Sequence, residues 1–334
     1  MTGIIVLNWN GWKDTIACLK SLYSLQETNF FVIVVDNGSS DNSIEEIDNF
    51  LKVNRKAEFY KVNEVSGNLD ITGADYGKIT NKTTFLYCLK QNYGFAKGNN
   101  IGIEFAKLLH PEFILLLNND TEVEPDFLSK LISFSKSYPK YVALCPKICF
   151  FYDKNLIWNC GGKIWWGFRK YYYARSKEDS IKEKEYLEIS FVTGCALFFR
   201  TSMVENSKLL TERFFHGEED FELSYRYKKL GYKMACVLGS KIYHKVGSST
   251  KSLNSIGKIY AHYLNRFINM RLHMNKVSYI CWKGVSFIHI YRLLKHRNIS
   301  NEEIIKFIKK LNIESKQLNE VTQQKFLDVL RNGI

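Results

Sequence analysis

The sequence of 334 residues lacks the cysteine patterns that hold metals or cross-link small domains. It has no CxxC pair and no cysteine and histidine cluster at a zinc spacing. Three of its eight cysteines, Cys88, Cys195 and Cys236, lie inside apolar, strand-like runs. Because buried thiols behave as small apolar groups, we expect free cysteines in a reducing compartment and neither a disulfide framework nor a zinc site.

Long hydrophobic runs are also missing. The chain begins with the strand-like residues MTGIIVLNW, without a basic segment and a long apolar stretch, so we expect no signal peptide and a cytoplasmic location. Residues 277–294 are apolar but contain Lys283, His289 and Arg292, which argues against a membrane span. We expect this stretch either to lie in a membrane interface or to dock on the rest of the protein.

Acidic residues are absent between Glu222 and Glu302. The net charge is +13, and residues 241–334 hold 17 Lys and Arg against 5 Asp and Glu, so the first 240 residues are nearly neutral. The basic C-terminal region is expected to meet an anionic membrane surface, a pyrophosphate-linked acceptor or nucleic acid. A Lys-rich solvated face is the alternative.

The most informative feature that is present is FILLLNND, residues 113–120. An apolar run of this length, with Pro111 before it and Pro125 after it, is typical of a buried parallel strand. The polar end should emerge at the carboxyl edge of the sheet, where open α/β sheets bind ligands. The pattern therefore predicts that Asp120 is delivered to a ligand site, although ordinary βα turns also begin with Asn or Asp.

The first 150 residues alternate short β-branched runs with helical periodicity, which predicts βαβ units and a mostly parallel sheet. The expected strands are residues 4–8, 31–36, 84–89, 113–118 and 142–148, and the expected helices are 12–24, 42–51, 95–109 and 125–137. Pro125 suits a first helical turn. Residues 63–83 lack a clear period and predict a long loop or insertion.

The second part of the chain is different in character. Residues 156–176 are aromatic and hairpin-like, with Gly161 and Gly162 as the expected turn, and they predict either a plain flap or an aromatic platform for a sugar or lipid acceptor. Further strands are expected at 191–199 and 232–237, with a helix at 218–230 between them. Apolar residues spaced by three and four from Ile256 predict a helix, and Ser300 with Glu303 predicts the capping box of a final helical tail.

Four further patterns carry polar chemistry. VVDNGSSDNS (residues 34–43) ends a strand in Asp36, and IIVLNWNG (4–11) places Asn8 and Asn10 at the same edge; both suit a nucleoside or an ordinary βα turn. NYGFAKGNN (92–100) matches neither GxxxxGK[ST] nor GxGxxG, which argues against P-loop and dinucleotide folds. GEEDFELSYR (217–226) begins a helix with three acids, where the helix dipole stabilises negative charge.

These patterns, together with VTGCALFFR (192–200) and HKVGSST (244–250), resemble in their order the inverting family 2 glycosyltransferases, in the rhamnosyltransferase-like branch. The resemblance covers roughly residues 3–275. It implies a GT-A fold, an α/β architecture with a mostly parallel twisted sheet flanked by helices, followed by a basic helical C-terminal region. The implied domains are a catalytic domain of residues 1–250, with a nucleotide-binding half (1–150) and an acceptor half (151–250), and a C-terminal region of residues 251–334.

The resemblance also implies roles for particular residues. Asp220 would be the general base, with Glu219 as its neighbour, although three consecutive acids leave this assignment open by one position. Asp120 and His244 would hold Mg²⁺ or Mn²⁺, with Asn118 in place of the first acid of the family's DxD motif. The donor would be bound by Asn8, Asn10, Asp36, Asn92, Lys97, Asn118, Asn119 and Gly194.

By this resemblance the protein is a metal-dependent, inverting hexosyltransferase of bacterial surface polysaccharide synthesis, such as capsule or O-antigen. It would use a UDP- or dTDP-sugar, with rhamnose or another hexose, and a saccharide or lipid-linked acceptor. The basic region would hold it on the inner face of the cell membrane. The alternatives are a nucleotidyltransferase, disfavoured by the missing triphosphate loop, and a non-catalytic nucleic-acid-binding protein.

Overall fold

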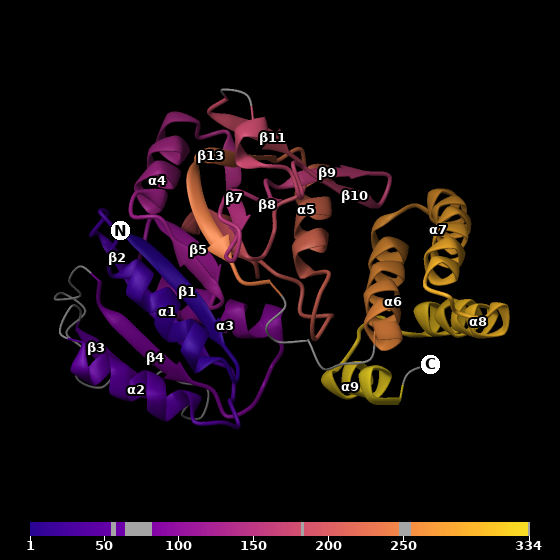
Figure 1. The fold of residues 1–334 in the computed structure, drawn as a ribbon, viewed down its shortest axis with the longest axis horizontal. Coiled ribbons are helices and arrows are strands. Elements are labelled where there is room, and N and C mark those ends of the chain that lie inside the picture. The colour runs from indigo at the N-terminus through magenta and orange to yellow at the C-terminus, as the bar shows by residue number, and fades with distance from the viewer. Residues whose placement is uncertain (55–57, 64–81, 182–183, 247–254, 333–334) are drawn as a thin grey trace.

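The computed structural model describes residues 1–54, 58–63, 82–181, 184–246 and 255–332. Figure 1 shows an α/β body that contains both the N-terminus and the sheet, and a group of C-terminal helices that adjoins one side of this body. The expected class, a mostly parallel twisted sheet flanked by helices, is confirmed.

The N-terminal half forms consecutive βα units. Strands β1, β2, β3, β4 and β5 lie parallel in the order β3-β4-β2-β1-β5. Their bounds and those of the intervening helices are β1 Thr2–Asn8, α1 Trp12–Leu22, β2 Phe30–Asp36, α2 Ser43–Val53, β3 Phe59–Asn63, β4 Thr84–Cys88, α3 Phe95–Lys107 and β5 Phe113–Asn118. The carboxyl ends of these parallel strands therefore share one edge of the sheet.

The second half extends the sheet beyond β5 through an antiparallel strand, β12 (Ala196–Arg200). The order continues β12-β7-β13-β11, and β6 and β8 pair with β13 and β7. The bounds are β6 Thr121–Val123, α4 Phe127–Ser137, β7 Tyr141–Phe150, β8 Ile157–Asn159, β11 Tyr186–Ile189, α5 Glu219–Lys229 and β13 Lys233–His244. A separate hairpin is formed by β9 (Gly162–Trp165) and β10 (Phe168–Tyr171).

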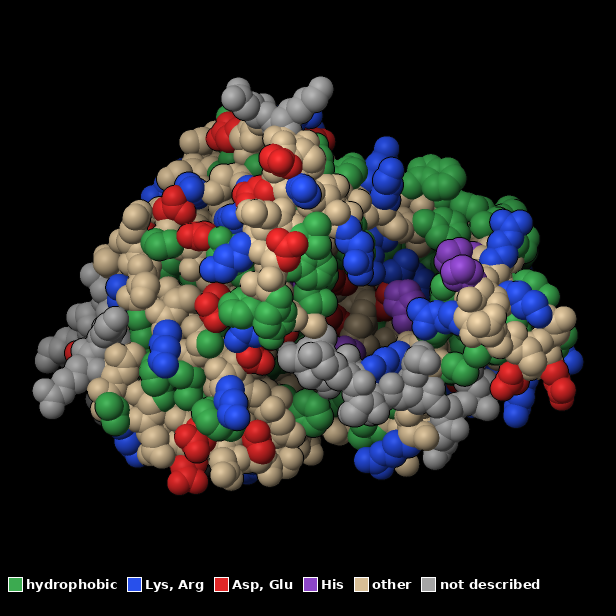
Figure 2. All heavy atoms as spheres, viewed as in Figure 1, with side chains coloured by type: hydrophobic (Ala, Val, Ile, Leu, Met, Phe, Trp, Pro, Cys, Tyr) green, Lys and Arg blue, Asp and Glu red, His purple; other side chains and the backbone are tan. Residues whose placement is uncertain are grey.

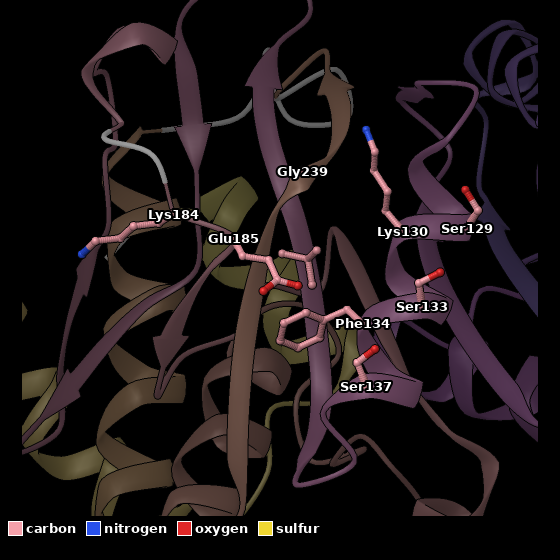
Figure 3. Close-up of a pocket in the computed structure, with 9 residues that line it drawn as sticks. Ser129, Lys130, Ser133, Phe134, Ser137, Lys184, Glu185 and Gly239 are labelled. Carbon is pink, nitrogen blue, oxygen red and sulfur yellow. The ribbon is translucent and has the colours of Figure 1, made fainter.

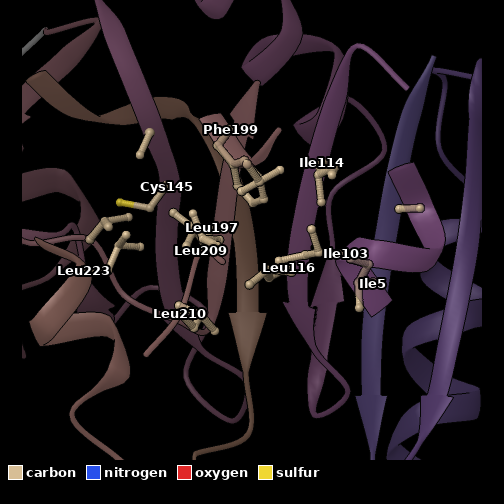
Figure 4. Close-up of a cluster of buried hydrophobic side chains, with 14 of the residues drawn as sticks. Ile5, Ile103, Ile114, Leu116, Cys145, Leu197, Phe199, Leu209, Leu210 and Leu223 are labelled. Atoms are coloured by element: carbon tan, nitrogen blue, oxygen red, sulfur yellow. The ribbon is translucent and has the colours of Figure 1, made fainter. Parts of the chain in front are cut away.

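Hydrophobic side chains alternate between the two faces of the sheet and build a core on each. One core contains Ile5, Ile114, Leu116 and Leu197 packed against Ile103 of α3, as Figure 4 shows. The opposite core packs the sheet against α1, α2 and α4. Burial on both faces explains why the parallel strands read as continuous apolar runs in the sequence.

Several expectations of the sequence need correction. Pro125 lies in the turn before α4, which begins at Phe127, and the 191–199 strand is formed only from Ala196. The hairpin turn is not at Gly161 and Gly162 but at Trp166 and Gly167, which have φ values of 44° and 78°. Two consecutive positive φ angles suit the turn that matches the twist of a two-residue hairpin. Of the expected 63–83 insertion, residues 64–81 lie outside the described residues.

The C-terminal helices are α6 (Ser255–His273), α7 (Lys276–His296), α8 (Asn301–Gln317) and α9 (Gln323–Asn332). They share one hydrophobic core with Phe191, Phe214 and Phe221 of the α/β body. Docking, one of the two alternatives for residues 277–294, is thus observed. The proposed boundary at residue 250 falls within 247–254, outside the described residues. Within the part of the chain that the structure describes, no helix is long and apolar enough to cross a bilayer.

Candidate active site

The ends of β1 and β2 form a closed polar network around Asp36. The Asn8 side-chain amide donates to the Asp36 carboxylate at 2.7 Å, and the Ser39 backbone N–H and hydroxyl donate to the same group at 2.9 and 2.7 Å. Asn8 and Asp36 are both fully buried. In this arrangement the polar atoms of Asn8 and Asp36 hold the loop after β2 in place.

Asn10 and Asn119 extend the network to the surface. The Asn10 side-chain oxygen accepts from the Ser40 backbone N–H at 2.8 Å, which joins the loops after β1 and β2. The Asn119 amide donates to the Thr15 hydroxyl at 3.0 Å, and Thr15 donates to Asn8 at 2.7 Å. The predicted residues of three strand ends are therefore brought together by hydrogen bonds.

The 92–100 segment reaches this edge from β4. The Asn92 side-chain oxygen accepts from the Gly94 backbone N–H and from the Asn37 amide, at 2.8 and 3.0 Å. Gly94 has φ of 84°, and a Cβ there would lie 2.3 Å from the Phe215 carbonyl oxygen, so only glycine fits. Lys97 is exposed on α3, with its ammonium 4.5 Å from the centre of the Tyr93 ring.

Asp120 and His244 lie side by side although 124 positions separate them in the sequence. The antiparallel pairing of β6 with β13 places His244 opposite Thr121, next to Asp120. The His244 Nε2 atom lies 3.1 Å from the Asp120 Oδ1 atom, and both residues are buried. Burial lowers the pKa of His244, but the neighbouring Cys195 sulfur and the hydrogen bond to Asp120 outweigh it and raise this pKa to about 10.

A carboxylate beside an imidazole offers oxygen and nitrogen donors of the kind that divalent ions such as Mn²⁺ accept, once the ion has displaced the second proton that the raised pKa leaves on His244. Asn118 lies half-buried at the end of β5, two residues before Asp120. Among the described residues no group of three or more Asp, Glu, His or Cys side chains could hold a metal ion by itself. The pair supplies two of the ligands that such an ion would need, and the others would have to come from outside this pair.

The three acids at the start of α5 have different partners. Glu218 is buried with φ of 73° and forms a two-point ion pair with Arg266 of α6, whose second nitrogen donates at 2.7 Å. Burial opposes the charge, but Arg266 and then His262 hold the pKa of Glu218 below its usual value. Both carboxylate oxygens of Glu218 accept hydrogen bonds from Arg266, which makes Glu218 unsuitable as a base that takes a proton from a substrate.

Glu219 and Asp220 differ in their access. Glu219 is buried, and its Oε2 atom has no hydrogen-bond partner among the described residues. Burial and the nearby Asp220 raise the pKa of Glu219 to about 8. Asp220 is half-buried, and its Oδ2 atom accepts from the Gly194 backbone N–H at 3.3 Å. Burial raises the pKa of Asp220, while the cation of Arg169 opposes this effect.

Arg169 was not anticipated from the sequence. It is on β10, and its guanidinium lies 3.8 Å from the Asp220 Oδ1 atom and 4.6 Å from the ring centres of Tyr171 and Phe191. An arginine at this distance favours the charged form of a carboxylate. Arg226, by contrast, pairs with Glu222 at 3.0 Å and donates to the Leu209 carbonyl, a structural role.

The start of β12 links the two acidic sites. The Gly194 N–H contacts Asp220, and the next residue, Cys195, accepts a hydrogen bond from the Asn118 backbone N–H at 2.9 Å. A Cβ on Gly194 would lie 3.4 Å from the Phe95 ring and 3.6 Å from Asp220. Asp220 and the Asp120–His244 pair therefore border the same region of the sheet edge. Figure 2 shows a hollow between the body and the C-terminal helices, with acidic, basic and histidine side chains around it.

A further pocket, shown in Figure 3, is separate from this region. It is lined by residues of α4, such as Lys130 and Phe134, together with Glu185 and Gly239. None of the predicted site residues contributes to it. The candidate site at the polar edge of the sheet is therefore identified by its hydrogen-bond network and not by this pocket.

Arg169 and Arg266 were missed because no spacing rule connects them to the acids. One signal was present in the sequence: three consecutive acids before an amphipathic helix need cations if they are buried. Arg266 is buried against Glu218, although it does not belong to the apolar positions spaced by three and four along its helix. The partner of a buried charge depends on tertiary packing, which helical periodicity does not report.

An open, mostly parallel α/β sheet with carboxylates at the carboxyl ends of its strands belongs to the class of folds that bind ligands at that edge. The family model described as glycosyl transferase family 2 matches residues 3–68 and 77–207. The chain belongs to this family. No curated protein matches the sequence.

Solved structures share the GT-A fold. GalNAc-T7 with UDP, GalNAc and Mn²⁺ aligns with a TM-score of 0.58 at 15% identity, over 93% of this chain and 54% of that one. The mannosyltransferase PcManGT from Pyrobaculum calidifontis, in complex with GDP-Man and Mn²⁺, aligns with 0.53 at 10% identity, over 95% and 86%. S. aureus TarS 1-349 aligns with 0.50 at 14%, over 99% and 81%. The chain spans about half the length of the GalNAc-T7 chain.

Proposed function

We propose that this protein is an inverting glycosyltransferase in which Asp220 is the general base. The observation that carries the proposal is the position of this carboxylate. It lies half-buried at the sheet edge, held by the Gly194 N–H and balanced by Arg169, while Glu218 is engaged by Arg266. Glu219, with its raised pKa, is the uncharged neighbour at neutral pH.

The proposed reaction is a single displacement. Asp220 accepts the proton of the acceptor hydroxyl as the oxygen of that hydroxyl attacks the anomeric carbon of the donor. The bond from this carbon to the diphosphate breaks on the opposite face, so the anomeric configuration is inverted. A glycosidase would instead need two carboxylates that face each other across the bond.

We propose that Asp120 and His244 hold Mg²⁺ or Mn²⁺ in the donor complex. The chemistry that such an ion supplies is stabilisation of the negative charge that develops on the departing diphosphate. The Asn8–Asp36–Ser39 network keeps in place the loop after β2, which is proposed to hold the nucleoside. The proposed donor site is bordered by Asn10, Asn92, Lys97, Asn118, Asn119 and Gly194. A UDP- or dTDP-sugar, with rhamnose or another hexose, is the proposed donor.

The acceptor is proposed to be a saccharide or a lipid-linked saccharide of bacterial surface polysaccharide synthesis, such as capsule or O-antigen. The basic C-terminal region supports a peripheral position on the inner face of the cell membrane, because its charge is opposite to that of anionic lipids.

The proposal is tested with a panel of nucleotide sugars and saccharide acceptors, with and without Mn²⁺, scored by release of nucleoside diphosphate. We expect one donor to be consumed with strong dependence on the metal. Asp120→Ala should remove most of the metal-stimulated rate, whereas Asp153→Ala, an exposed loop aspartate, serves as the matched control. Turnover of a nucleoside triphosphate with release of pyrophosphate, and of no sugar donor, would instead establish a nucleotidyltransferase.

A further inference from the structure

We propose that the outer face of α7 is a docking surface for an anionic lipid bilayer, helped by the outer face of the β9–β10 hairpin. This proposal deepens the proposed function, since it rests on the lipid-linked form of the acceptor. We call the exposed apolar residues of α7 the α7 stripe; they are Val277, Ile280, Val285, Ile288 and Tyr291.

The α7 stripe has the geometry of one helix face. Val277, Ile280, Ile288 and Tyr291 fit spacings of three and four residues with Gly284 between them, which keeps them on one side of a helix. Val277 is 72% exposed, Ile280 54% and Ile288 57%. An exposed apolar surface that is continuous along a helix marks an interaction site, unlike scattered single residues.

The opposite face of α7 already has its core partners. Trp282, Ile290 and Leu294 are buried in the hydrophobic cluster that joins the C-terminal helices to the α/β body. Apolar residues therefore lie on two sides of α7, and only one of these sides is needed for folding.

The charges around the α7 stripe point to an anionic occupant. Arg292 and Lys295 are exposed at its C-terminal end, and no Asp or Glu occurs between Glu222 and Glu302. Each basic residue close to an anionic membrane strengthens the attraction to it. Figure 2 shows hydrophobic side chains gathered over α7 with Lys and Arg side chains among them.

The β9–β10 hairpin contacts α7 on the side that carries Trp282, opposite the α7 stripe, and it presents an exposed surface of its own. The Phe168 ring lies 6.1 Å from the ring of Trp282, and the register pairs Phe168 with Trp165 and Lys170 with Lys163. Strand alternation puts these four residues on one face and Arg169 on the other. Trp165 is 66% exposed, and tryptophan with lysine is typical of residues at a membrane interface.

This arrangement gives the docking surface a catalytic consequence. The same hairpin that presents Trp165 on its outer face brings Arg169 to Asp220 on its inner face. A bilayer against the outer face would hold the proposed base close to the membrane surface, where the sugar of a lipid-linked acceptor lies. Docking would then select for acceptors attached to lipid.

A bilayer fits better than a second copy of the chain. In a symmetric dimer built on this surface, Arg292 and Lys295 would meet either their own copies or the exposed Lys276 at the other end of α7 in the second copy, and like charges oppose association. A membrane offers both an apolar interior for the α7 stripe and anionic headgroups for the basic residues. Because no described helix can span the bilayer, the interaction would be interfacial.

The test is co-sedimentation of the full chain with phosphatidylcholine vesicles, with and without phosphatidylglycerol, in the absence of donor and acceptor. The variant I280D/I288D places charges in the α7 stripe. The matched control is I305D/I313D on α8, which changes two isoleucines at the same spacing with exposures of 50% and 53%. We expect binding to phosphatidylglycerol vesicles to fall about a hundredfold in the first variant and less than about threefold in the control.

A second variant, R292Q/K295Q, should weaken binding to phosphatidylglycerol vesicles about tenfold and leave binding to pure phosphatidylcholine unchanged. Equal vesicle binding by wild type and I280D/I288D would overturn the proposal. It would also be overturned if the wild type were a dimer and I280D/I288D became monomeric but still bound vesicles as the wild type does. Since co-sedimentation measures no turnover, its result can be interpreted even if the proposed enzymatic function is wrong. In a separate assay, transfer to a soluble acceptor should be the same in wild type and I280D/I288D.

Discussion

At the level of single residues, the pairing of buried charges around Arg266 determines how the proposed base is held. Arg266 joins Glu218 by a two-point ion pair, and one of its nitrogens donates to the Gly167 carbonyl at 3.1 Å. One guanidinium of α6 therefore holds both the acidic start of α5 and the turn of the hairpin that carries Arg169. The C-terminal helices thus help to position the proposed base.

Replacing Arg266 with alanine should destabilise the protein markedly. The change leaves the Glu218 carboxylate buried without a cation, which typically costs about 3–5 kcal/mol in the free energy of unfolding. Urea denaturation at neutral pH measures this loss. The double variant Arg266→Met with Glu218→Gln removes both charges and should recover most of the stability; equal loss in both variants would argue against unpaired charge as the cause.

The pH dependence of stability should change in the same variant. The folded pKa of Glu218 is lower than its unfolded pKa, so its contribution to stability is present above the unfolded value and is lost as the pH falls through the folded one. Arg266→Ala should lose this acid-sensitive contribution. If the free energy of unfolding falls as steeply with acidification in the variant as in the wild type, Glu218 is not the source of this acid-sensitive contribution.

At the scale of secondary-structure elements, the sequence predicted the βα units well and the hairpin poorly. Buried parallel strands such as β5 appear in the sequence as continuous apolar runs, and Asp36 marks the end of β2. The hairpin turn was misplaced because adjacent glycines at 161 and 162 gave the stronger local signal. The observed turn uses Trp166 in a positive-φ conformation that packing against α6 and α7 supports.

The hairpin turn offers a direct test at this scale. Gly167 has φ of 78°, and a Cβ there would lie 2.8 Å from the Met270 sulfur and the Trp282 ring nitrogen. Gly167→Ala should therefore lower the free energy of unfolding by about 1–3 kcal/mol. The matched control is Gly284→Ala in α7, where nothing lies within 4 Å of an added Cβ; there we expect a gain of about 0.5–1 kcal/mol.

Chemical denaturation of the two glycine variants checks this prediction. A stability loss at position 284 as large as at position 167 would mean that helix packing, and not the hairpin turn, determines the effect. A rise in stability for both variants would show that the turn tolerates a side chain.

At the scale of the whole molecule, the body and the C-terminal helices form one folding unit. Phe214 pairs with Val321 as an isolated bridge, the Phe215 N–H donates to the Val321 carbonyl at 2.9 Å, and one core crosses the junction. The sequence predicted a basic helical C-terminal region, residues 251–334, after the catalytic domain. Charge distribution alone could not show this shared core, because it depends on contacts between residues far apart in the chain.

Deletion of the C-terminal helices should consequently disrupt the body. A chain that ends at residue 250 exposes Phe214, Phe221 and Phe191, which are buried in the full protein. We expect a lower melting temperature and binding of a hydrophobic dye, measured against the full chain. An unchanged melting temperature for the truncated chain would contradict a single folding unit.

Asp220 is proposed to remove the proton of the acceptor hydroxyl. The rate of sugar transfer measures whether it does. Once a donor is found, the rate is compared for wild type, Asp220→Asn and Glu219→Gln at the same donor and metal concentrations. The account predicts a loss of about 10²–10⁴-fold for Asp220→Asn with unchanged folding, and a much smaller loss for Glu219→Gln. Full transfer activity in Asp220→Asn would contradict it.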